Sequence, residues 1–226
     1  MSGSEKNQNV GLFGGTFDPV HKGHLAVAEL AIKKISLDRI IFIPAADPPH
    51  KKQPGASYSH RVAMLEIALA GADPNFQISL LEAERAAPSY TVDTLLELQK
   101  RLGSQRFHFI IGADSLLELH LWYRYHRLPE LTDFIVAARP GISMYAVQQA
   151  IDRLPGDFLS DSSRMQWQRE DGAKIYYLAD AAENVSSSSI RMQISRGTRP
   201  DTVSNEVFAY ITAHGLYQNR VTTVDH

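Results

Sequence analysis

Residues 11–24 read Gly-Leu-Phe-Gly-Gly-Thr-Phe-Asp-Pro-Val-His-Lys-Gly-His. An apolar run enters paired glycines, a polar turn follows, and residues 25–35 continue as an amphipathic segment. The order predicts a strand, a loop and a helix. Gly14 and Gly15 let the backbone approach a ligand closely, and the first helical turn presents free N–H groups and a positive dipole end. The stretch therefore predicts a phosphate-binding turn.

His21 and His24 stand three residues apart at the head of this helix, so they share one face of its first turn. Two imidazoles can donate hydrogen bonds to a phosphate, and they carry positive charge if protonated. A zinc site is the alternative. The chain has no cysteine, and no glutamate accompanies the histidines as in a His-Glu-x-x-His motif, so metal ligation is the weaker interpretation.

The whole chain of 226 residues suits one domain, residues 1–226, of generous size. Lysine and arginine number 23 against 25 aspartates and glutamates, and the net charge of −2 argues against nucleic acid or a membrane surface as a partner. The polar residues 1–9 contain no apolar core of a signal peptide, so we expect a cytoplasmic protein. Residues 1–8 are expected to form a mobile tail.

Further apolar runs alternate with helical patterns along the chain. The five runs after the first occupy residues 39–44, 76–81, 107–111, 133–138 and 174–178. Six strands alternating with helices predict an α/β fold, a doubly wound Rossmann-like parallel sheet with helices on both faces. The pattern loosens over residues 141–172, where we expect a helix near 145–154 and then irregular chain, and we interpret this part as an insertion that serves as an oligomer contact or a lid.

A second chemical motif, Val-Ser-Ser-Ser-Ser-Ile-Arg, fills residues 185–191. Serine runs are most often flexible linkers. This run instead precedes a short helix that continues to Ile194, so N–H groups, hydroxyls and the Arg191 guanidinium can converge on one phosphate group.

Three weaker signals follow other strands. The loop 45–58 is rich in proline and carries His50, Lys51 and Lys52 beyond a parallel strand, where ligands bind in open α/β sheets. The Ser-Tyr-Thr entry at residues 89–91 offers helix-start amides to a carboxylate, although a plain helix cap is the simpler interpretation. The Gly-Ala-Asp turn at residues 112–114 is typical of a nucleotide contact, but alone it is a weak motif.

Residues 14–24 resemble the signature of the nucleotidyltransferase superfamily, whose His-x-Gly-His corresponds to the HIGH motif of class I aminoacyl-tRNA synthetases. Residues 185–191 resemble that group's Ile-Ser-Ser-Thr-x-Ile-Arg, with Val185 for isoleucine and Ser188 for threonine. Over nearly its whole length the chain is most similar to bacterial nicotinate mononucleotide adenylyltransferases.

This resemblance implies roles for particular residues. His24 is expected on the transferring phosphate, with His21 and Arg191 assisting as the other catalytic residues. Expected ATP and phosphate contacts are Gly14, Gly15, Thr16, Phe17, Lys51, Gly112, Asp114, Ser187 and Ser188. Tyr90, Thr91 and Trp122 are expected to bind nicotinate, although an aromatic among apolar neighbours, like Trp122, is usually core.

The resemblance also implies the reaction: ATP and nicotinate mononucleotide form deamido-NAD and pyrophosphate in NAD biosynthesis. Mg²⁺ is expected with ATP, held mainly by phosphates and water. Three alternatives stay open: transfer to another acceptor such as phosphopantetheine, a preference for nicotinamide mononucleotide, and a nucleotide sensor without catalysis. The partners expected are these small molecules, without nucleic acid or membrane, and a homo-oligomer stays open.

Overall fold

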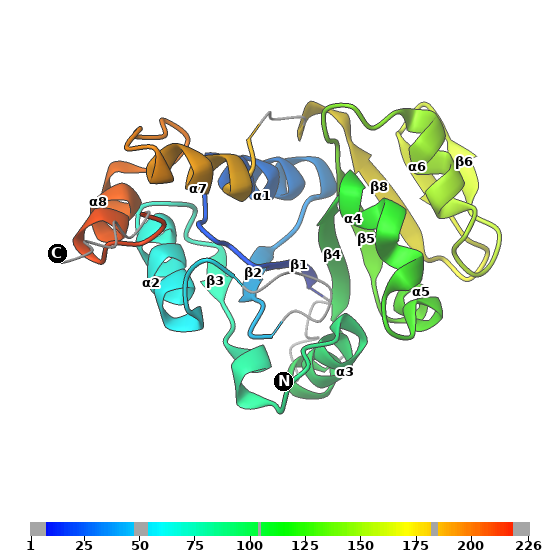
Figure 1. Ribbon diagram of the computed structural model, residues 1–226. Coiled ribbons are helices and arrows are strands. Elements are labelled where there is room, and N and C mark those ends of the chain that lie inside the picture. The colour runs from blue at the N-terminus through cyan, green and yellow to red at the C-terminus, as the bar shows by residue number, and fades with distance from the viewer. Residues whose placement is uncertain (1–7, 48–53, 104, 182–184, 219–226) are drawn as a thin grey trace, which may run out of the picture.

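The computed structural model describes residues 8–47, 54–103, 105–181 and 185–218. Its strands form one sheet in the order β3-β2-β1-β4-β5-β8-β7-β6 (Figure 1). The strands are β1 Asn9–Gly15, β2 Arg39–Pro44, β3 Phe76–Ile78, β4 Arg106–Gly112, β5 Asp133–Ala137, β6 Leu159–Asp161, β7 Gln166–Gln168 and β8 Lys174–Leu178. The first six in this order are parallel, which confirms the six predicted strands and the doubly wound α/β fold.

Strand β1 lies inside the sheet, between β2 and β4, and its apolar residues are covered on both faces of the sheet. Leu12 pairs with Ile41 of β2 on one side and with Phe109 of β4 on the other. Leu12 is fully buried. A parallel strand buried on both faces needs such a continuous apolar run, and the run was the signal in the sequence.

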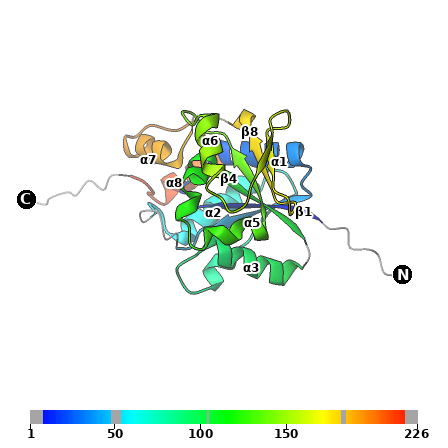
Figure 2. The ribbon, with the colours of Figure 1, turned by 90° about the vertical axis from the view of Figure 1, so that its right-hand side faces the viewer.

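Helices cover both faces of the sheet. Their bounds are α1 Lys22–Ile35, α2 Tyr58–Leu69, α3 Thr91–Leu102, α4 Ala113–Glu118, α5 Leu128–Leu131, α6 Met144–Ile151, α7 Ser187–Ser195 and α8 Asn205–Ala213. One apolar cluster packs helices α1, α2, α7 and α8 against the sheet. A second cluster packs helices α3, α4, α5 and α6 against it. Figure 2 shows the two layers, with α3 on one side of the sheet and α1 and α7 on the other. Within the described ranges, no helix is long and apolar enough to span a membrane.

Three local expectations differ from the structure. The helix expected near residues 145–154 is α6, Met144–Ile151, which ends three residues earlier. The strand expected over residues 76–81 ends at Ile78, and Leu81 begins a short 3₁₀ helix, Leu81–Glu84.

Part of the segment expected to be irregular, residues 155–172, is a hairpin. Strands β6 and β7 pair antiparallel, and β7 extends the sheet along β8. Trp167 anchors β7 in the core at 3% exposure, and its Nε1 donates to Oε1 of Gln148 on α6 at 2.8 Å. The flanking Gln166 and Gln168 give the strand a weak apolar signal, so the sequence pattern did not indicate it.

The connection between β3 and β4 returns the chain to the middle of the sheet. Strands β2 and β3 extend outward on one side of β1, while β4, β5 and β8 extend outward on the other. The order of strands therefore reverses between β1 and β4. In open α/β sheets the crevice outside the carboxyl ends of such strands is the usual place for a ligand.

Candidate active site

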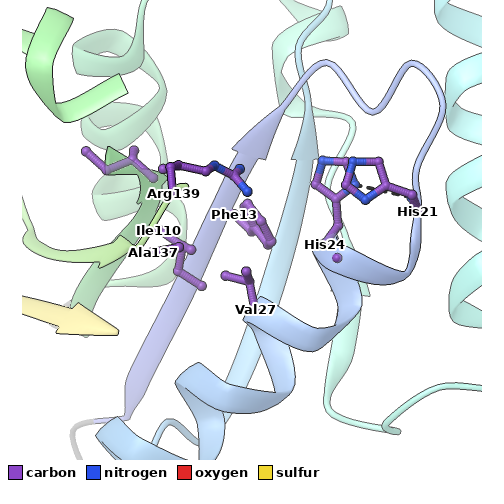
Figure 3. A pocket seen from close by; sticks show the side chains of 10 residues that line it. Phe13, His21, His24, Val27, Ile110, Ala137 and Arg139 are labelled. Carbon is purple, nitrogen blue, oxygen red and sulfur yellow. Dashed lines mark hydrogen bonds between the residues drawn. The ribbon is translucent and has the colours of Figure 1, made fainter. Parts of the chain in front are cut away.

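The two histidines of the first motif stack on each other at the start of α1. His21 caps the helix, and His24 lies in its first turn. Their ring centroids are 3.7 Å apart at an interplanar angle of 29°, and the backbone N–H of His21 donates to Nδ1 of His24 at 3.2 Å (Figure 3). The expectation that both side chains share one face is therefore confirmed.

His21 is buried, and this decides its charge. Burial, and then the nearby positive charge of Arg139, lower the pKa of His21 from 6.5 to about 4. The His21 imidazole is therefore neutral at pH 7 in this structure. It can serve a phosphate as a hydrogen-bond donor, whereas the sequence had also allowed it a positive charge.

The paired glycines lie against aromatic rings that leave no room for a side chain. A Cβ on Gly14 would lie 3.0 Å from Cζ of Phe109, and one on Gly15 would lie 3.0 Å from Cζ of Phe17. Phe17 itself is buried at 1% exposure, and its backbone φ is 48°. Its ring packs edge-on against the ring of His24, with the ring centroids 5.1 Å apart. The Phe17 side chain thus packs against the turn, and only the Phe17 backbone is available to contact a phosphate.

Thr16 has a buried Oγ1 without a hydrogen-bond partner among the described residues. A buried hydroxyl normally finds a partner, so an orphan here is unusual. A group entering the turn would supply that partner, which fits the predicted phosphate contact.

Arg139, just beyond the end of β5, lines a small cavity together with His21 and His24. The cavity is lined by side chains of β1, α1 and β4 together with Arg139, which Figure 3 shows extending toward Phe13 across from the two histidines. Arg139 Nε lies 3.4 Å from Oδ1 of Asp114, and a Cβ on Gly112 would meet both side chains at under 3 Å. Gly112 therefore keeps space for the Arg139–Asp114 pair. Arg139 has one signal in the sequence, its position as a cation directly after a buried strand, and this signal alone assigns it no role.

The second motif lies beside the first, although about 170 residues separate them in sequence. Ser186 caps α7, and the Ser187 hydroxyl donates to the carbonyl oxygen of Pro19 at 2.9 Å. Arg191 Nη1 donates to the carbonyl oxygen of Asp18 at 2.6 Å, and Nη2 donates to the Ser188 hydroxyl at 3.2 Å. The structure thus brings Arg191 to the turn, while the Ser187 hydroxyl already has a structural partner.

The expected nicotinate contacts come from the start of α3 and from Trp122, which lies next to Phe109. Tyr90 immediately precedes α3, and Thr91 is its first residue. Trp122 is half-buried, with its ring edge-on to Phe109 at 6.4 Å. The Tyr90 ring lies 4.3 Å from that of Tyr123, which the sequence had not singled out. Since Phe109 also contacts the position of Gly14, this aromatic group adjoins the phosphate turn.

The segment that leads toward Lys51 is tied to the start of α3. Ser89 N–H donates to the carbonyl oxygen of Asp47 at 3.1 Å. Lys51 itself, expected to contact phosphate, lies outside the described residues.

Comparison with known proteins identifies the class. Residues 12–193 match the model of the cytidylyltransferase-like family. A probable nicotinate-nucleotide adenylyltransferase of Trichlorobacter lovleyi is 40% identical over 211 residues, covering 92% of this chain and 99% of the relative. One of Neisseria gonorrhoeae is 35% identical, covering 93% and 99%. The chain therefore belongs to the cytidylyltransferase-like family, and within it to the nicotinate-nucleotide adenylyltransferases.

Solved structures agree with the fold. Plasmodium falciparum nicotinic acid mononucleotide adenylyltransferase complexed with APC has a TM-score of 0.71 at 17% identity, covering 93% of this chain and 97% of that one. The same enzyme complexed with NaAD gives a TM-score of 0.70 at 18% identity.

Proposed function

We propose that this enzyme transfers the AMP group of ATP to nicotinate mononucleotide, giving nicotinate adenine dinucleotide (NaAD) and pyrophosphate. The observation that carries this is the convergence of the His21–His24 turn with the Arg191 helix at the carboxyl end of β1. The adenylyltransferase relatives, 35–40% identical over almost their whole length, support the same reaction.

The reaction needs no protein nucleophile. An anionic oxygen of the 5′-phosphate of nicotinate mononucleotide attacks the α-phosphorus of ATP. A new P–O bond forms, the bond from the α-phosphorus to the bridging oxygen breaks, and pyrophosphate leaves with that electron pair. The protein positions the two phosphates and neutralises charge as it moves.

His24 donates to the transferring α-phosphate, with His21 as a neutral donor and Arg191 as a fixed cation. The backbone at Gly14 and Gly15, the Thr16 and Ser188 hydroxyls and the loop cation Lys51 complete the phosphate contacts. Gly112 and Asp114 receive the adenosine. Arg139 joins this set because it lines the cavity with His21 and His24.

The nicotinate end of the acceptor lies between α3 and Trp122. The N–H groups at Tyr90 and Thr91 bind the carboxylate, since helix-start amides favour an anion. The Trp122 ring stacks on the pyridine. The Plasmodium falciparum neighbour, solved with NaAD, supports a dinucleotide of this kind in the crevice.

Mg²⁺ enters with ATP in this proposal. Among the described residues, no group of three or more metal-binding side chains could hold a metal ion. We propose that phosphate oxygens and water hold the cation, which is the usual arrangement for Mg²⁺ with a nucleotide. When bound, it neutralises charge on the departing pyrophosphate.

The test is pyrophosphate release with ATP and Mg²⁺, comparing three acceptors: nicotinate mononucleotide, nicotinamide mononucleotide and phosphopantetheine. We expect rapid release with the nicotinate acceptor and much slower release with the others. A preference for either of the others would overturn the roles of Tyr90, Thr91 and Trp122. No pyrophosphate release with any of the three acceptors would favour a nucleotide sensor over an enzyme.

The insertion at residues 141–172, a homo-oligomer and a cytoplasmic location stay predictions from the sequence.

A further inference from the structure

Asp18 is a buried carboxylate in the middle of the phosphate turn, with 3% exposure. Its Oδ2 accepts the backbone N–H of Gly55 at 2.7 Å, and its Oδ1 accepts that of Ala56 at 3.1 Å. Oδ1 also accepts the Tyr217 hydroxyl at 2.7 Å. The carboxylate is thus held by three donors from two distant parts of the chain.

The same residue holds Arg191. Nη1 of Arg191 donates to the Asp18 carbonyl oxygen at 2.6 Å and lies 3.5 Å from Oδ2 of its carboxylate. Hydrogen bonds to charged groups are among the strong ones, and a fixed carboxylate orients the guanidinium that faces it. The position of the Arg191 guanidinium therefore depends on where the Asp18 carboxylate is held.

Tyr217 follows the end of α8 and is well suited to fix that carboxylate. Burial raises the pKa of the Tyr217 hydroxyl, and the negative charge of Asp18 raises it further, so the phenol keeps its proton and acts as the donor. Packing confines the group too, because a Cβ on Gly55 would lie 3.1 Å from Cδ of Arg191 and 3.2 Å from Cε1 of Tyr217.

We infer that Tyr217, through its hydrogen bond to the Asp18 carboxylate, is a positioning residue that holds Arg191 in line with the transferring phosphate. Without the hydroxyl, two backbone N–H groups remain to hold the carboxylate, and it can shift from 3.5 Å toward a closer ion pair with Arg191. A closer pair draws the guanidinium away from the phosphate and neutralises more of its charge. The inference rests on the proposed function, since it assigns Arg191 a phosphate.

The first test is Tyr217→Phe, which removes one oxygen and keeps the ring. We expect kcat for pyrophosphate release to fall about tenfold, as for the loss of one hydrogen bond to a charged group, with KM for both substrates little changed. Tyr210→Phe is the matched control, because the Tyr210 hydroxyl contacts Nδ1 of His60 at 3.0 Å and not the turn. Equal kcat values for the two variants would overturn the inference.

A double-mutant cycle separates positioning from general loosening. Arg191→Lys should lower kcat strongly, and adding Tyr217→Phe should then cost little more, because Tyr217 acts through Arg191. Losses that multiply would show an effect independent of Arg191 and would contradict the inference.

Gly55→Ala gives a second test if Tyr217→Phe fails to fold. The added methyl group presses on both Arg191 and Tyr217, so kcat should fall while thermal unfolding shifts only slightly; an unchanged kcat would contradict the inference. Failure of the proposed function looks different: the wild-type enzyme would then release no pyrophosphate with any of the three acceptors.

Discussion

His24 lies in the first turn of α1, half-buried, with its ring against that of His21. As a preorganised donor to the transferring phosphate, it should contribute mainly to kcat. His24→Ala is expected to lower kcat about 10²- to 10³-fold, with an unchanged circular dichroism spectrum. His126→Ala, at an exposed position, serves as the control. Turnover near the wild-type level in the His24 variant would show that the assignment is wrong.

Arg139 acts on His21 through its charge. Burial is the larger cause of the lowered pKa of His21, and Arg139 is the second cause. Arg139→Gln should therefore raise the pKa of His21 from about 4, while burial keeps it below 6.5. An NMR titration of the His21 imidazole measures this, with Arg124→Gln, at an exposed position, as the control. A pKa that does not move would contradict a close approach of the two side chains.

At this scale the sequence predicted the residues whose spacing is local. His21 and His24 share a helical turn, and Arg191 follows a serine run, so each pattern could be seen in a short window. Asp18 and Tyr217 could not be paired this way, because 199 residues separate them. Such contacts appear only when the topology brings the segments together.

Arg61, on α2, joins the ends of two strands. It is buried at 1% exposure, and it donates to the carbonyl oxygens of Thr16 at 2.7 Å and Ala45 at 2.8 Å. These atoms lie just beyond β1 and β2, so one guanidinium fixes both the phosphate turn and the loop that follows β2. Nothing in the sequence indicated this bridge, because Arg61 lies 45 residues from Thr16 and 16 residues from Ala45.

Arg61→Met should unfold more easily because it leaves two buried carbonyls unpaired. We expect the free energy of unfolding to fall by about 3 kcal/mol, measured by urea denaturation. Arg101→Met, which removes an exposed arginine paired with Glu84 and Glu97, should leave the midpoint nearly unchanged. Equal midpoints for the two variants would contradict a bracing role for Arg61.

At the scale of elements, the sequence predicted the six parallel strands because each lies in a largely apolar run, although Gln77 interrupts the run at β3. The sequence did not predict the hairpin of β6 and β7, because its strands are three residues long and mostly polar. Strand β6 is an edge strand, with one partner and an open side, so its residues carry little of the hydrophobic pattern. Trp167 was the one strong signal, but a lone tryptophan does not indicate a strand.

For the whole molecule, two buried histidines make stability depend on pH. Burial lowers the pKa of His108 to about 4, as it does for His21. The Asp133 carboxylate, whose Oδ2 lies 3.5 Å from Nδ1 of His108, raises this pKa. The positive charges of Arg106 and Lys174 lower it further. Between pH 6.5 and 4 the unfolded chain binds a proton at each histidine and the folded chain does not, so stability falls as the pH is lowered.

The free energy of unfolding should therefore drop across this window by roughly 3 kcal/mol for each histidine. Urea titrations at pH 7 and pH 4.5 measure the change. His108→Leu should reduce the difference between the two pH values, whereas His126→Ala should not. A His108→Leu variant with the full wild-type difference would show that His108 does not contribute.

The bond between Tyr217 and Asp18 also sets an order of events during synthesis. A ribosome makes Asp18 199 residues before Tyr217. A growing chain can pair β1 with β2 and β4, and so form the glycine turn, long before the segment with Arg191 emerges. By our inference, AMP transfer reaches its full rate only after the end of α8 has been made and Tyr217 has folded back onto Asp18.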